Sequence, residues 1–208
     1  MPTSVEFWDK VADGYAKSKI RDERAYETKL KITQELFPPD AEVLEIACGT
    51  GTTALHHAPY VKHYTATDIS ANMLDIARQK ASDLGVSNVA FEVQDIAEAS
   101  WPRAHYDAVL AMSILHLLPD RAGALAKVYN TVKPGGVFVS STICLGEMSF
   151  IFPALIAAMK LVGKAPKTVD SLTHQSVADT ITAAGFIIED HHRMSKAKVA
   201  FIVARKPA

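Results

Sequence analysis

Hydrophobic and polar residues alternate along this chain in two rhythms. Short apolar or β-branched runs have the length and composition of buried strands, and they cover residues 42–47, 63–67, 89–93, 106–112 and 137–143. Between these runs, apolar residues recur every three or four positions, which is typical of helices with one buried face. Strands that alternate with helices predict a parallel sheet that is covered by helices on both faces.

Helix boundaries are predicted from the residues between the strands. Ser70 is expected to cap a helix that Gly85 ends. The buried face of this helix is predicted to comprise Met73, Leu74, Ala77, Ala81 and Leu84. A later helix, closed by Pro134-Gly135-Gly136, is expected to carry an apolar face of Leu125, Val128, Tyr129 and Val132.

Both ends of the chain depart from the regular alternation. Two amphipathic helices are predicted at 7–15 and 25–37, before the first strand. After a helix near 176–184, two strand-like runs at 186–189 and 198–204 follow with no helix between them. The eight-residue connection between these two runs is too short for a parallel crossover, so the last strand is expected to run antiparallel to its neighbour.

Composition and charge fit one globular domain. The chain has 208 residues and is 49% hydrophobic, and its 22 Lys and Arg nearly balance 23 Asp and Glu. Because the charges nearly cancel, the protein has no overall positive field that would attract the phosphates of a nucleic acid, so nucleic acid is not an expected partner. Cys48 and Cys144 lack disulfide or metal-ligand spacing, which favours a reducing, cytoplasmic location. The first residues carry no secretory signal, and the apolar stretch at 148–162 is too short to cross a membrane.

The residues VLEIACGTG at 43–51 carry the clearest chemical signal. A buried strand runs into a tight turn that contains Gly49 and Gly51 and opens a helix. Such a turn at the carboxyl end of the first strand is where open α/β sheets bind nucleotides. Asp68 and Asp95 follow the next two predicted strands. The carboxylate of Asp68 can accept hydrogen bonds from both ribose hydroxyls, and the adenine amino group can donate one near Asp95. The alternative is that both are helix caps or turn residues.

Four segments together resemble the class I S-adenosylmethionine (SAM)-dependent methyltransferases, and within them the small-molecule, UbiE-like group. They are VLEIACGTG at 43–51, TATDIS at 65–70, VQDI at 93–96 and KPGG at 133–136. The resemblance implies a Rossmann-like α/β fold with a seven-stranded, mostly parallel sheet, an antiparallel C-terminal strand and helices on both faces. It also implies one domain over 1–208, with a helical cap at 1–40 and a lid-like apolar insertion at 145–167.

The resemblance further implies which residues bind SAM. They are Glu45, Ala47, Cys48, Gly49, Thr50 and Gly51 around the amino acid part, Asp68, Ile69 and Met73 around the ribose, Asp95 and Ile96 at the adenine, Ala111, Met112 and Ser113 on the methionine side, and Tyr15 on the N-terminal helix. Tyr15 could equally pack that helix onto the core. Ala47 stands where the family usually has the first of three glycines, and its methyl group is tolerated if the residue keeps an extended backbone.

Methyl transfer from a sulfonium is an in-line displacement that yields S-adenosylhomocysteine (SAH). The protein mainly has to hold the acceptor near the methyl group and exclude water. His116, just after the fourth strand, is the candidate catalytic residue, because a histidine can accept the proton of an oxygen or nitrogen acceptor. The alternative is that His116 packs beneath the next helix. No metal is predicted, because no Asp/Asn cluster or persuasive His pair is present.

A small molecule is the expected acceptor. The segment AMSILHL at 111–117 lacks the Asn/Asp-Pro-Pro-aromatic pattern resembling DNA amino methyltransferases, and the chain contains no Pro-Cys nucleophile. The insertion at 145–167 is expected to form an apolar lid over the acceptor, although an ordinary buried helix would show the same pattern. Lys160, Lys164 and Lys167 beside it would suit a phospholipid or quinone at a membrane surface, which is the less favoured partner.

Two other classes of function stay open at this point. The segment GTGTTA at 49–54 fits a dinucleotide-binding turn, and Tyr129 and Lys133 have the spacing of a short-chain dehydrogenase pair. Tyr129 is more simply read as a core aromatic, and Lys133 as a lysine at a helix C-terminus. The other alternative is a protein that binds SAM without catalysis, which intact cofactor motifs do not distinguish from an enzyme.

Overall fold

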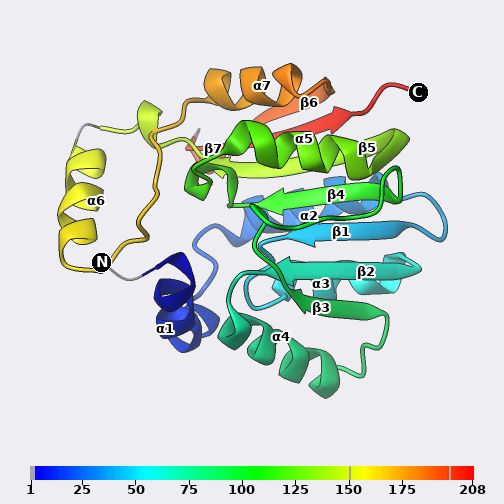
Figure 1. Ribbon diagram of the computed structural model, residues 1–208, viewed down its shortest axis with the longest axis horizontal. Coiled ribbons are helices and arrows are strands. Elements are labelled where there is room, and N and C mark those ends of the chain that lie inside the picture. The colour runs from blue at the N-terminus through cyan, green and yellow to red at the C-terminus, as the bar shows by residue number, and fades with distance from the viewer. Residues whose placement is uncertain (1–2, 150, 197) are drawn as a thin grey trace.

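The computed structural model describes residues 3–149, 151–196 and 198–208, and its strands form one seven-stranded sheet in the order β3-β2-β1-β4-β5-β7-β6 (Figure 1). The strands are β1 (Glu42–Ile46), β2 (His63–Asp68), β3 (Val89–Val93), β4 (Tyr106–Met112), β5 (Val132–Ile143), β6 (Ile187–Met194) and β7 (Val199–Arg205). β1 to β5 are parallel, and β7 is antiparallel to both of its neighbours. The predicted fold class is confirmed.

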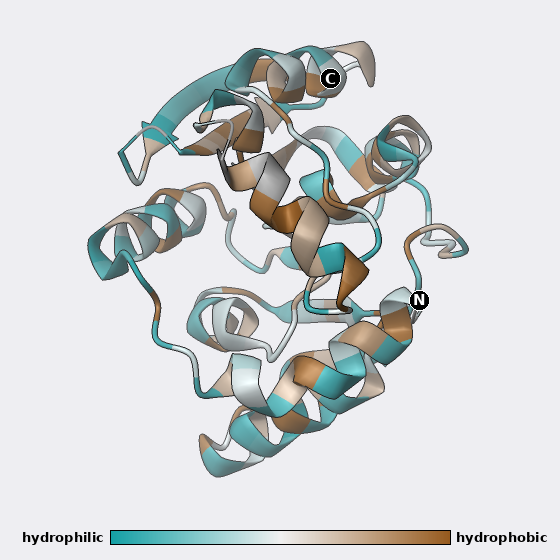
Figure 2. Cartoon of the chain, turned by 90° about the vertical axis from the view of Figure 1, so that its left-hand side faces the viewer, coloured by the Kyte–Doolittle hydropathy of each residue, from teal (hydrophilic) through white to brown (hydrophobic). Residues whose placement is uncertain are grey.

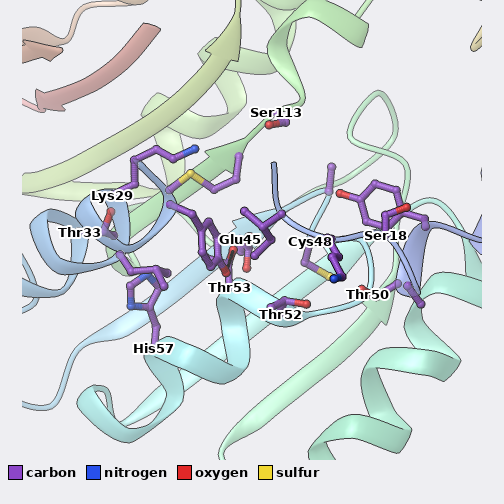
Figure 3. A pocket seen from close by; sticks show the side chains of 18 residues that line it. Ser18, Lys29, Thr33, Glu45, Cys48, Thr50, Thr52, Thr53, His57 and Ser113 are labelled. Carbon is purple, nitrogen blue, oxygen red and sulfur yellow. Dashed lines mark hydrogen bonds between the residues drawn. The ribbon is translucent and has the colours of Figure 1, made fainter. Parts of the chain in front are cut away.

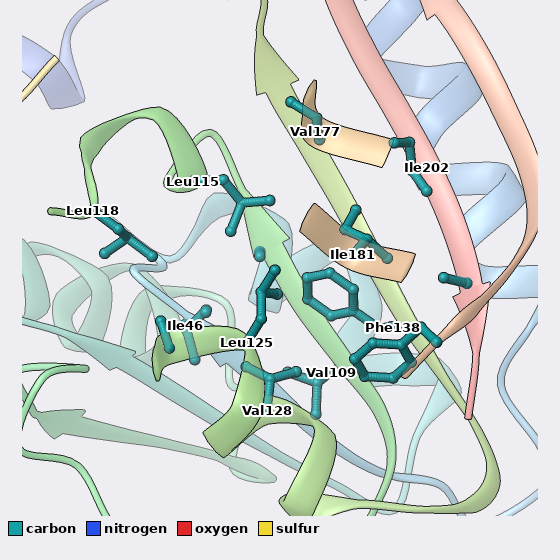
Figure 4. Packing of buried hydrophobic residues seen from close by; sticks show 14 of the residues in the cluster. Ile46, Val109, Leu115, Leu118, Leu125, Val128, Phe138, Val177, Ile181 and Ile202 are labelled. Carbon is teal, nitrogen blue, oxygen red and sulfur yellow. The ribbon is translucent and has the colours of Figure 1, made fainter. Parts of the chain in front are cut away.

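Helices cover both faces of this sheet. The α-helices of the described residues are α1 (Ser4–Ala16), α2 (Glu23–Glu35), α3 (Thr52–His57), α4 (Ala71–Asp83), α5 (Arg121–Thr131), α6 (Ile151–Leu161) and α7 (His174–Ala183), of which α6 stands beyond the strand ends and covers neither face. Alternate side chains of β1 point to opposite faces of the sheet. Leu44 and Ile46 belong to the same core cluster as Leu125 of α5, whereas Val43 belongs to the cluster that includes Ala54 of α3. The first of these two clusters is drawn in Figure 4. Burial on both sides explains why the parallel strands are continuous apolar runs.

Two predicted helix faces end earlier than expected. Ser70 caps α4 as predicted, accepting a hydrogen bond from the backbone of Met73, but Leu84 is 67% exposed because it lies at the C-cap, beyond the last packed turn. Val132 begins β5 rather than completing α5. Pro134 explains this second difference, because the residue before a proline is driven to an extended conformation and the helix has to end before it.

The C-terminal hairpin is longer than predicted. β6 extends to Met194, although the apolar run that predicted it stops near Glu189, so only a short connection precedes β7. The residues between Glu189 and Met194 are polar because β6 is an edge strand with an exposed face, which removes the hydrophobic signal. The antiparallel direction of the last strand is confirmed.

The insertion after β5 forms the helix α6, which stands beyond the carboxyl ends of the parallel strands (Figure 1). Figure 2, viewed from that side, shows α6 in front of the strand ends and α1 beside it. Phe152, Leu155 and Leu161 of α6 are 43%, 54% and 77% exposed, so the alternative of an ordinary buried helix is wrong for these residues. Phe150, which belongs to the predicted apolar insertion, lies outside the described residues. No helix in the described part of the chain has the length and apolar character to span a membrane.

Candidate active site

The strand order reverses between β1 and β4, and the candidate site lies at the carboxyl ends of these two strands. The chain builds β2 and β3 on one side of β1 and then crosses to β4 on the other side. In open α/β sheets this switch leaves a crevice, because the connections leave the two strands in opposite directions. Ala47 follows β1 and Ser113 follows β4, and both residues line the cavities found there.

Three adjoining cavities occupy this crevice. The β3 cavity, about 250 Å³, is lined by the segment 94–97 after β3 and by Trp8 of α1. The central cavity, about 80 Å³, lies against Asp68 and Met73. The α2 cavity, about 340 Å³, extends beneath α2 and is drawn in Figure 3.

Shared lining residues connect these cavities in a row. Trp8 and Ile69 line both the β3 cavity and the central cavity. Tyr15, Met112 and Ser113 line both the central cavity and the α2 cavity. The central cavity therefore joins the other two, and an elongated ligand can extend from one end of the row to the other.

The glycine-containing turn after β1 is built from left-handed residues. Ala47, Gly49 and Gly51 have φ angles of 55°, 56° and 72°. The condition under which the Ala47 methyl group would be tolerated, an extended backbone, is therefore not met, and a left-handed alanine costs roughly 1–2 kcal/mol because its Cβ crowds the backbone. A Cβ on Gly51 would lie 2.8 Å from Ala77 Cβ and 2.9 Å from Phe91 Cε1, so this glycine lets the turn pack against α4 and β3.

Asp68 fastens the turn to the end of β2. Its Oδ2 accepts the backbone N–H of Gly49 at 2.8 Å, and its Oδ1 accepts that of Ser70 at 2.9 Å. Burial raises the pKa of Asp68, since desolvation disfavours the carboxylate, and these hydrogen bonds offset part of the shift. The helix cap of α4 is Ser70 and not Asp68, but the bond to the N–H of Ser70, two residues along the chain, is the turn contact that the alternative interpretation of Asp68 also offered.

Asp95 occupies a turn after β3, as its alternative interpretation requires. Its Oδ1 accepts the backbone N–H of Ala97 at 2.9 Å. The residue is exposed, and it also lines the β3 cavity together with Ile96. The turn role and a ligand-binding role are compatible here, because the second oxygen of a carboxylate has its own acceptor sites.

Glu45 is a buried carboxyl at the wall of the α2 cavity. Its residue is 1% exposed, and its Oε2 accepts the hydroxyl of Tyr64 at 2.9 Å. Burial raises the pKa of Glu45 to about 8, because the cavity and the core do not solvate the charged form. A cation that enters this cavity would stabilise the carboxylate and release its proton.

Tyr15 lies at the mouth of the site and is not a core aromatic. Its side chain is 51% exposed, and its Cε1 lies 3.5 Å from the position that a Cβ of Gly49 would occupy. Trp8 packs edge-on against Tyr15, with 6.4 Å between ring centroids. The aromatic side chains of α1 therefore lie over the turn, where they can cover a bound ligand.

The structure brings most of the predicted cofactor residues to the three cavities. The lining residues among them are Tyr15, Glu45, Ala47, Cys48, Gly49, Thr50, Asp68, Ile69, Met73, Asp95, Ile96, Met112 and Ser113. Gly51 and Ala111 line none of the three. Ala111 is fully buried because its side chain points into the core cluster beneath α5, and Gly51 is buried for the packing reason given above.

The structure does not bring His116 to any of the three cavities. The residue is 6% exposed, its Nδ1 has no hydrogen-bond partner among the described residues, and its carbonyl accepts the backbone N–H of Asp170. Burial lowers its pKa to about 4. A buried, neutral imidazole agrees with the alternative that His116 packs beneath neighbouring segments.

The dehydrogenase-like pair also lies apart from the cavities. Tyr129 packs edge-on against Phe186, with ring centroids 5.1 Å apart, and the ammonium of Lys206 lies over its ring. Lys133 pairs with Asp107 at 2.8 Å and belongs to β5, so its interpretation as a helix-terminal lysine is wrong. Neither Tyr129 nor Lys133 lines any of the three cavities.

Sequence reasoning missed the residues that α2 and α3 contribute. Tyr26, Lys29 and Thr33 of α2 line the α2 cavity, as does His57 of α3 (Figure 3). The first three recur at helical spacing, which is the signal that could have found them. That signal indicates a shared helix face and does not distinguish a cavity wall from a solvated surface.

Comparisons with known proteins agree with this geometry. Residues 43–136 match a family model described as a methyltransferase domain. The ubiquinone biosynthesis O-methyltransferase of Alkalilimnicola ehrlichii is 33% identical over 128 residues, covering 60% of this chain and 50% of that protein. The malonyl-[acyl-carrier protein] O-methyltransferase of Serratia marcescens is 30% identical, covering 53% of this chain and 41% of that protein. The chain thus spans about half the length of these curated relatives.

Solved structures share the fold at low sequence identity. The [4+2]-cyclase SpnF superposes with a TM-score of 0.80 and 18% identity, covering 100% of this chain and 97% of that one. The phosphoethanolamine N-methyltransferase 2 of Haemonchus contortus, solved with SAM, gives a TM-score of 0.76 and 16% identity, covering 100% of this chain and 61% of that one. Because similar folds carry different reactions, these structures support the architecture alone.

Proposed function

From the premise that this chain carries a class I SAM-dependent methyltransferase domain, we propose that it transfers the methyl group of SAM to a small-molecule acceptor and releases SAH. The observation that carries the proposal is the row of three cavities at the carboxyl ends of β1 and β4, with Asp68 at its centre and Glu45 farther along. An elongated cofactor with a diol in its middle and an ammonium at one end suits this order of carboxylates.

Each part of SAM has a matching environment in the row. The adenine takes the β3 cavity, beside Asp95 and Ile96, and the ribose takes the central cavity, where Asp68 accepts its hydroxyls and Ile69 and Met73 provide apolar contacts. The amino acid part extends past Ala47 toward Glu45. Cys48, Gly49 and Thr50 line this path, Met112 and Ser113 close its other side, and Tyr15 covers it.

Lys80 supports the part of the turn that contacts the amino acid end. Its Nζ donates to the carbonyl oxygen of Thr50 at 3.1 Å and to the Thr50 hydroxyl at 2.9 Å. With Asp68 holding Gly49 from β2, the turn is fastened on both sides. A turn that is already fixed loses little conformational freedom when the cofactor binds.

The reaction is an in-line displacement at the methyl carbon. Tyr15, Ala47, Met112 and Ser113 line both the central and the α2 cavity, so the sulfonium sits at this junction and the acceptor approaches through the α2 cavity. The acceptor atom forms its bond to carbon while the carbon–sulfur bond breaks, and the electron pair stays on sulfur. The protein contributes alignment and exclusion of water. We assign no proton transfer to His116.

Residues 1–208 act as one domain in this proposal, with 1–40 as a cap and 145–167 as a lid. The cap is fastened to the cofactor side, since Asp9 Oδ1 accepts the hydroxyl of Ser70 at 2.6 Å and its carbonyl accepts the Asn72 side-chain amide at 3.2 Å. A cytoplasmic location is supported by the two unpaired cysteines, Cys48 and Cys144, which suit a reducing compartment.

An oxygen acceptor is favoured by the curated relatives, whose names describe O-methyltransferases. A second candidate is a quinone or phospholipid presented at a membrane surface. The exposed apolar residues Phe152, Leu155 and Leu161 of α6 favour it, because apolar side chains beside lysines can insert at a lipid surface.

Turnover tests the proposal directly. Purified protein is incubated with SAM and a panel of small phenols, carboxylic acids and amines, and SAH formation is quantified by mass spectrometry, with Asp68→Ala as the control. Acceptor-dependent SAH that the variant loses supports a methyltransferase. Tight SAM binding without SAH formation with any acceptor would instead identify a non-catalytic SAM-binding protein or, as the cyclase shares the fold, an enzyme of another reaction class.

A further inference from the structure

Two lysines line the α2 cavity, and the proposed cofactor contacts use neither: Lys19 is exposed in the segment before α2, whereas Lys29 is partly buried. The Nζ of Lys29 donates to Ser141 Oγ at 3.1 Å. Ser141 pairs with Met112 across β5 and β4, and its carbonyl accepts the backbone N–H of Ser113 at 2.7 Å. Lys29 is therefore anchored beside the junction of the central and α2 cavities, and Figure 3 shows it extending from α2 toward the side where Ser113 lies.

Lys29 forms no ion pair in the described part of the chain, although the carboxylate of Asp22, the N-cap of α2, acts on it from a distance and raises its pKa, against the larger effect of burial. None of the ion pairs there includes Lys29. Glu45 is the acidic residue that lines the same cavity; its pKa of about 8 keeps it mostly neutral at pH 7 while the cavity is empty, and in the proposed cofactor complex its carboxylate pairs with the ammonium of SAM or SAH. Burial lowers the pKa of Lys29, because desolvation disfavours the ammonium. An anion bound in the cavity would offset this penalty.

The inner end of the α2 cavity carries two more unsatisfied polar groups. Thr33 Oγ1 and His57 Nε2 have no hydrogen-bond partner among the described residues, although their residues are 0% and 1% exposed. Both residues line the cavity, and Leu30 and Met112 add apolar surface. Buried polar atoms normally have partners, so these two indicate a place for ligand oxygens beside an apolar wall.

We propose that the α2 cavity is the acceptor site and that Lys29 selects acceptors with an ionised oxygen, such as a phenolate or a carboxylate. This inference rests on the proposed methyltransferase function. The ionised oxygen donates a lone pair to the methyl carbon, the carbon–sulfur bond breaks, and SAH leaves as a neutral thioether. A carboxylic acid has already lost its proton to solvent at pH 7, and a phenol, whose pKa is about 10 in water, releases its proton to solvent as it binds beside the Lys29 ammonium, so the step needs no protein base. That chemistry agrees with the position of His116 outside the cavities.

The carboxylate of SAM is the other anion that could reach Lys29. Both sources share the same chemistry, so the test has to separate them. Benzoate and benzamide provide a matched pair of probes, because they have nearly the same size and differ by one negative charge. Their binding is measured by calorimetric or NMR titration of protein that is saturated with SAH, and again without SAH.

Three variants define the test. Lys29→Met removes the charge and keeps the length, Lys29→Arg restores a cation, and Lys31→Met is the matched control, because Lys31 is exposed on α2 and does not line the cavity. We expect the native protein to bind benzoate about tenfold more tightly than benzamide. Lys29→Met should abolish this preference, Lys29→Arg should retain most of it, and Lys31→Met should leave it unchanged. SAH affinity should be the same in all four proteins.

Several outcomes overturn the inference. They are equal binding of the two probes, binding of neither, or a benzoate preference that survives in Lys29→Met. Weaker SAH binding by Lys29→Met with the preference intact would assign Lys29 to the cofactor carboxylate instead. If the native protein fails to bind SAH, the proposed function fails, and the titrations without SAH still decide whether Lys29 binds an anion. Lys29→Gln, which retains a donor toward Ser141, replaces Lys29→Met if that variant does not fold.

Discussion

The central cavity and the α2 cavity meet at the same residues but are built in different ways. Around the central cavity, the polar groups are already paired: Asp68 accepts two backbone N–H groups, and Ser70 caps α4. In the α2 cavity, Thr33 and His57 present unpaired atoms, and Lys29 forms no ion pair among the described residues. A paired wall is rigid before the ligand arrives, whereas unpaired groups gain their partners from the ligand. The first arrangement suits an invariable cofactor, and the second suits a selected acceptor.

The largest expected effect is the loss of cofactor binding when the central carboxylate is removed. Asp68→Ala should weaken SAH affinity by about 100-fold, because charged hydrogen bonds to the ribose are lost and the turn loses its contact at Gly49. Asp95→Ala should weaken SAH affinity by about tenfold, since Asp95 is exposed and a hydrogen bond from the adenine to it would compete with water. Calorimetric titration measures both affinities. An Asp68→Ala protein that folds and binds SAH normally would remove the central cavity from the cofactor site.

Glu45 should reveal a trade between stability and binding. Its pKa of about 8 lies above the ordinary value of 4.5, so its contribution to folding is most favourable below pH 4.5 and is lost as the pH rises toward 8. Glu45→Gln removes this dependence. We expect the SAM-free variant to gain about 1–3 kcal/mol above pH 7, which is several degrees in Tm, and to bind SAM more weakly.

Thermal unfolding of both proteins at pH 5, 7 and 8.5 checks this expectation. The gain should grow with pH, and a gain that is equal at all three values would show that Glu45 does not titrate as described. Glu42→Gln is the control, because Glu42 begins the same strand, is only partly buried and pairs with Lys62 at 3.2 Å.

Ala47→Gly should stabilise the turn slightly. Glycine adopts φ near 55° without the Cβ penalty but loses more backbone entropy on folding, so the net gain should be about 0.5–1 kcal/mol. Ala111→Gly, at a buried strand position, should destabilise the protein instead. Chemical denaturation of both variants gives the comparison, and a destabilised Ala47→Gly would contradict the backbone argument.

The smallest expected effect is that of His116 on turnover. His116→Gln should change kcat by less than about twofold and leave its pH profile unaltered, since the imidazole does not reach the cavities. General bases typically contribute 10²–10⁴-fold. A loss of that size, together with a shifted pH profile, would return His116 to the catalytic role that its position after β4 predicted.

The same division explains what the sequence could reveal. The residues of the proposed cofactor site could be predicted because short stretches of sequence identify them: a glycine-containing turn follows an apolar strand, and aspartates stand at the ends of the next two strands. Tertiary contacts decide the rest. Lys29 and Thr33 look like ordinary residues of an amphipathic helix until α2 folds against β5 and α3. The left-handed φ of Ala47 could not be predicted because nothing in its neighbours specifies φ, and the predicted last but one strand was too short because the exposed edge strand β6 lacks an apolar run.

The central claim is that the row of cavities binds SAM, and calorimetric titration of the native protein with SAH and with NADH tests it most directly. We predict micromolar binding of SAH and no binding of NADH, with one SAH per chain. Binding of NADH without SAH would contradict the claim, because it would show that the turn after β1 binds a dinucleotide instead.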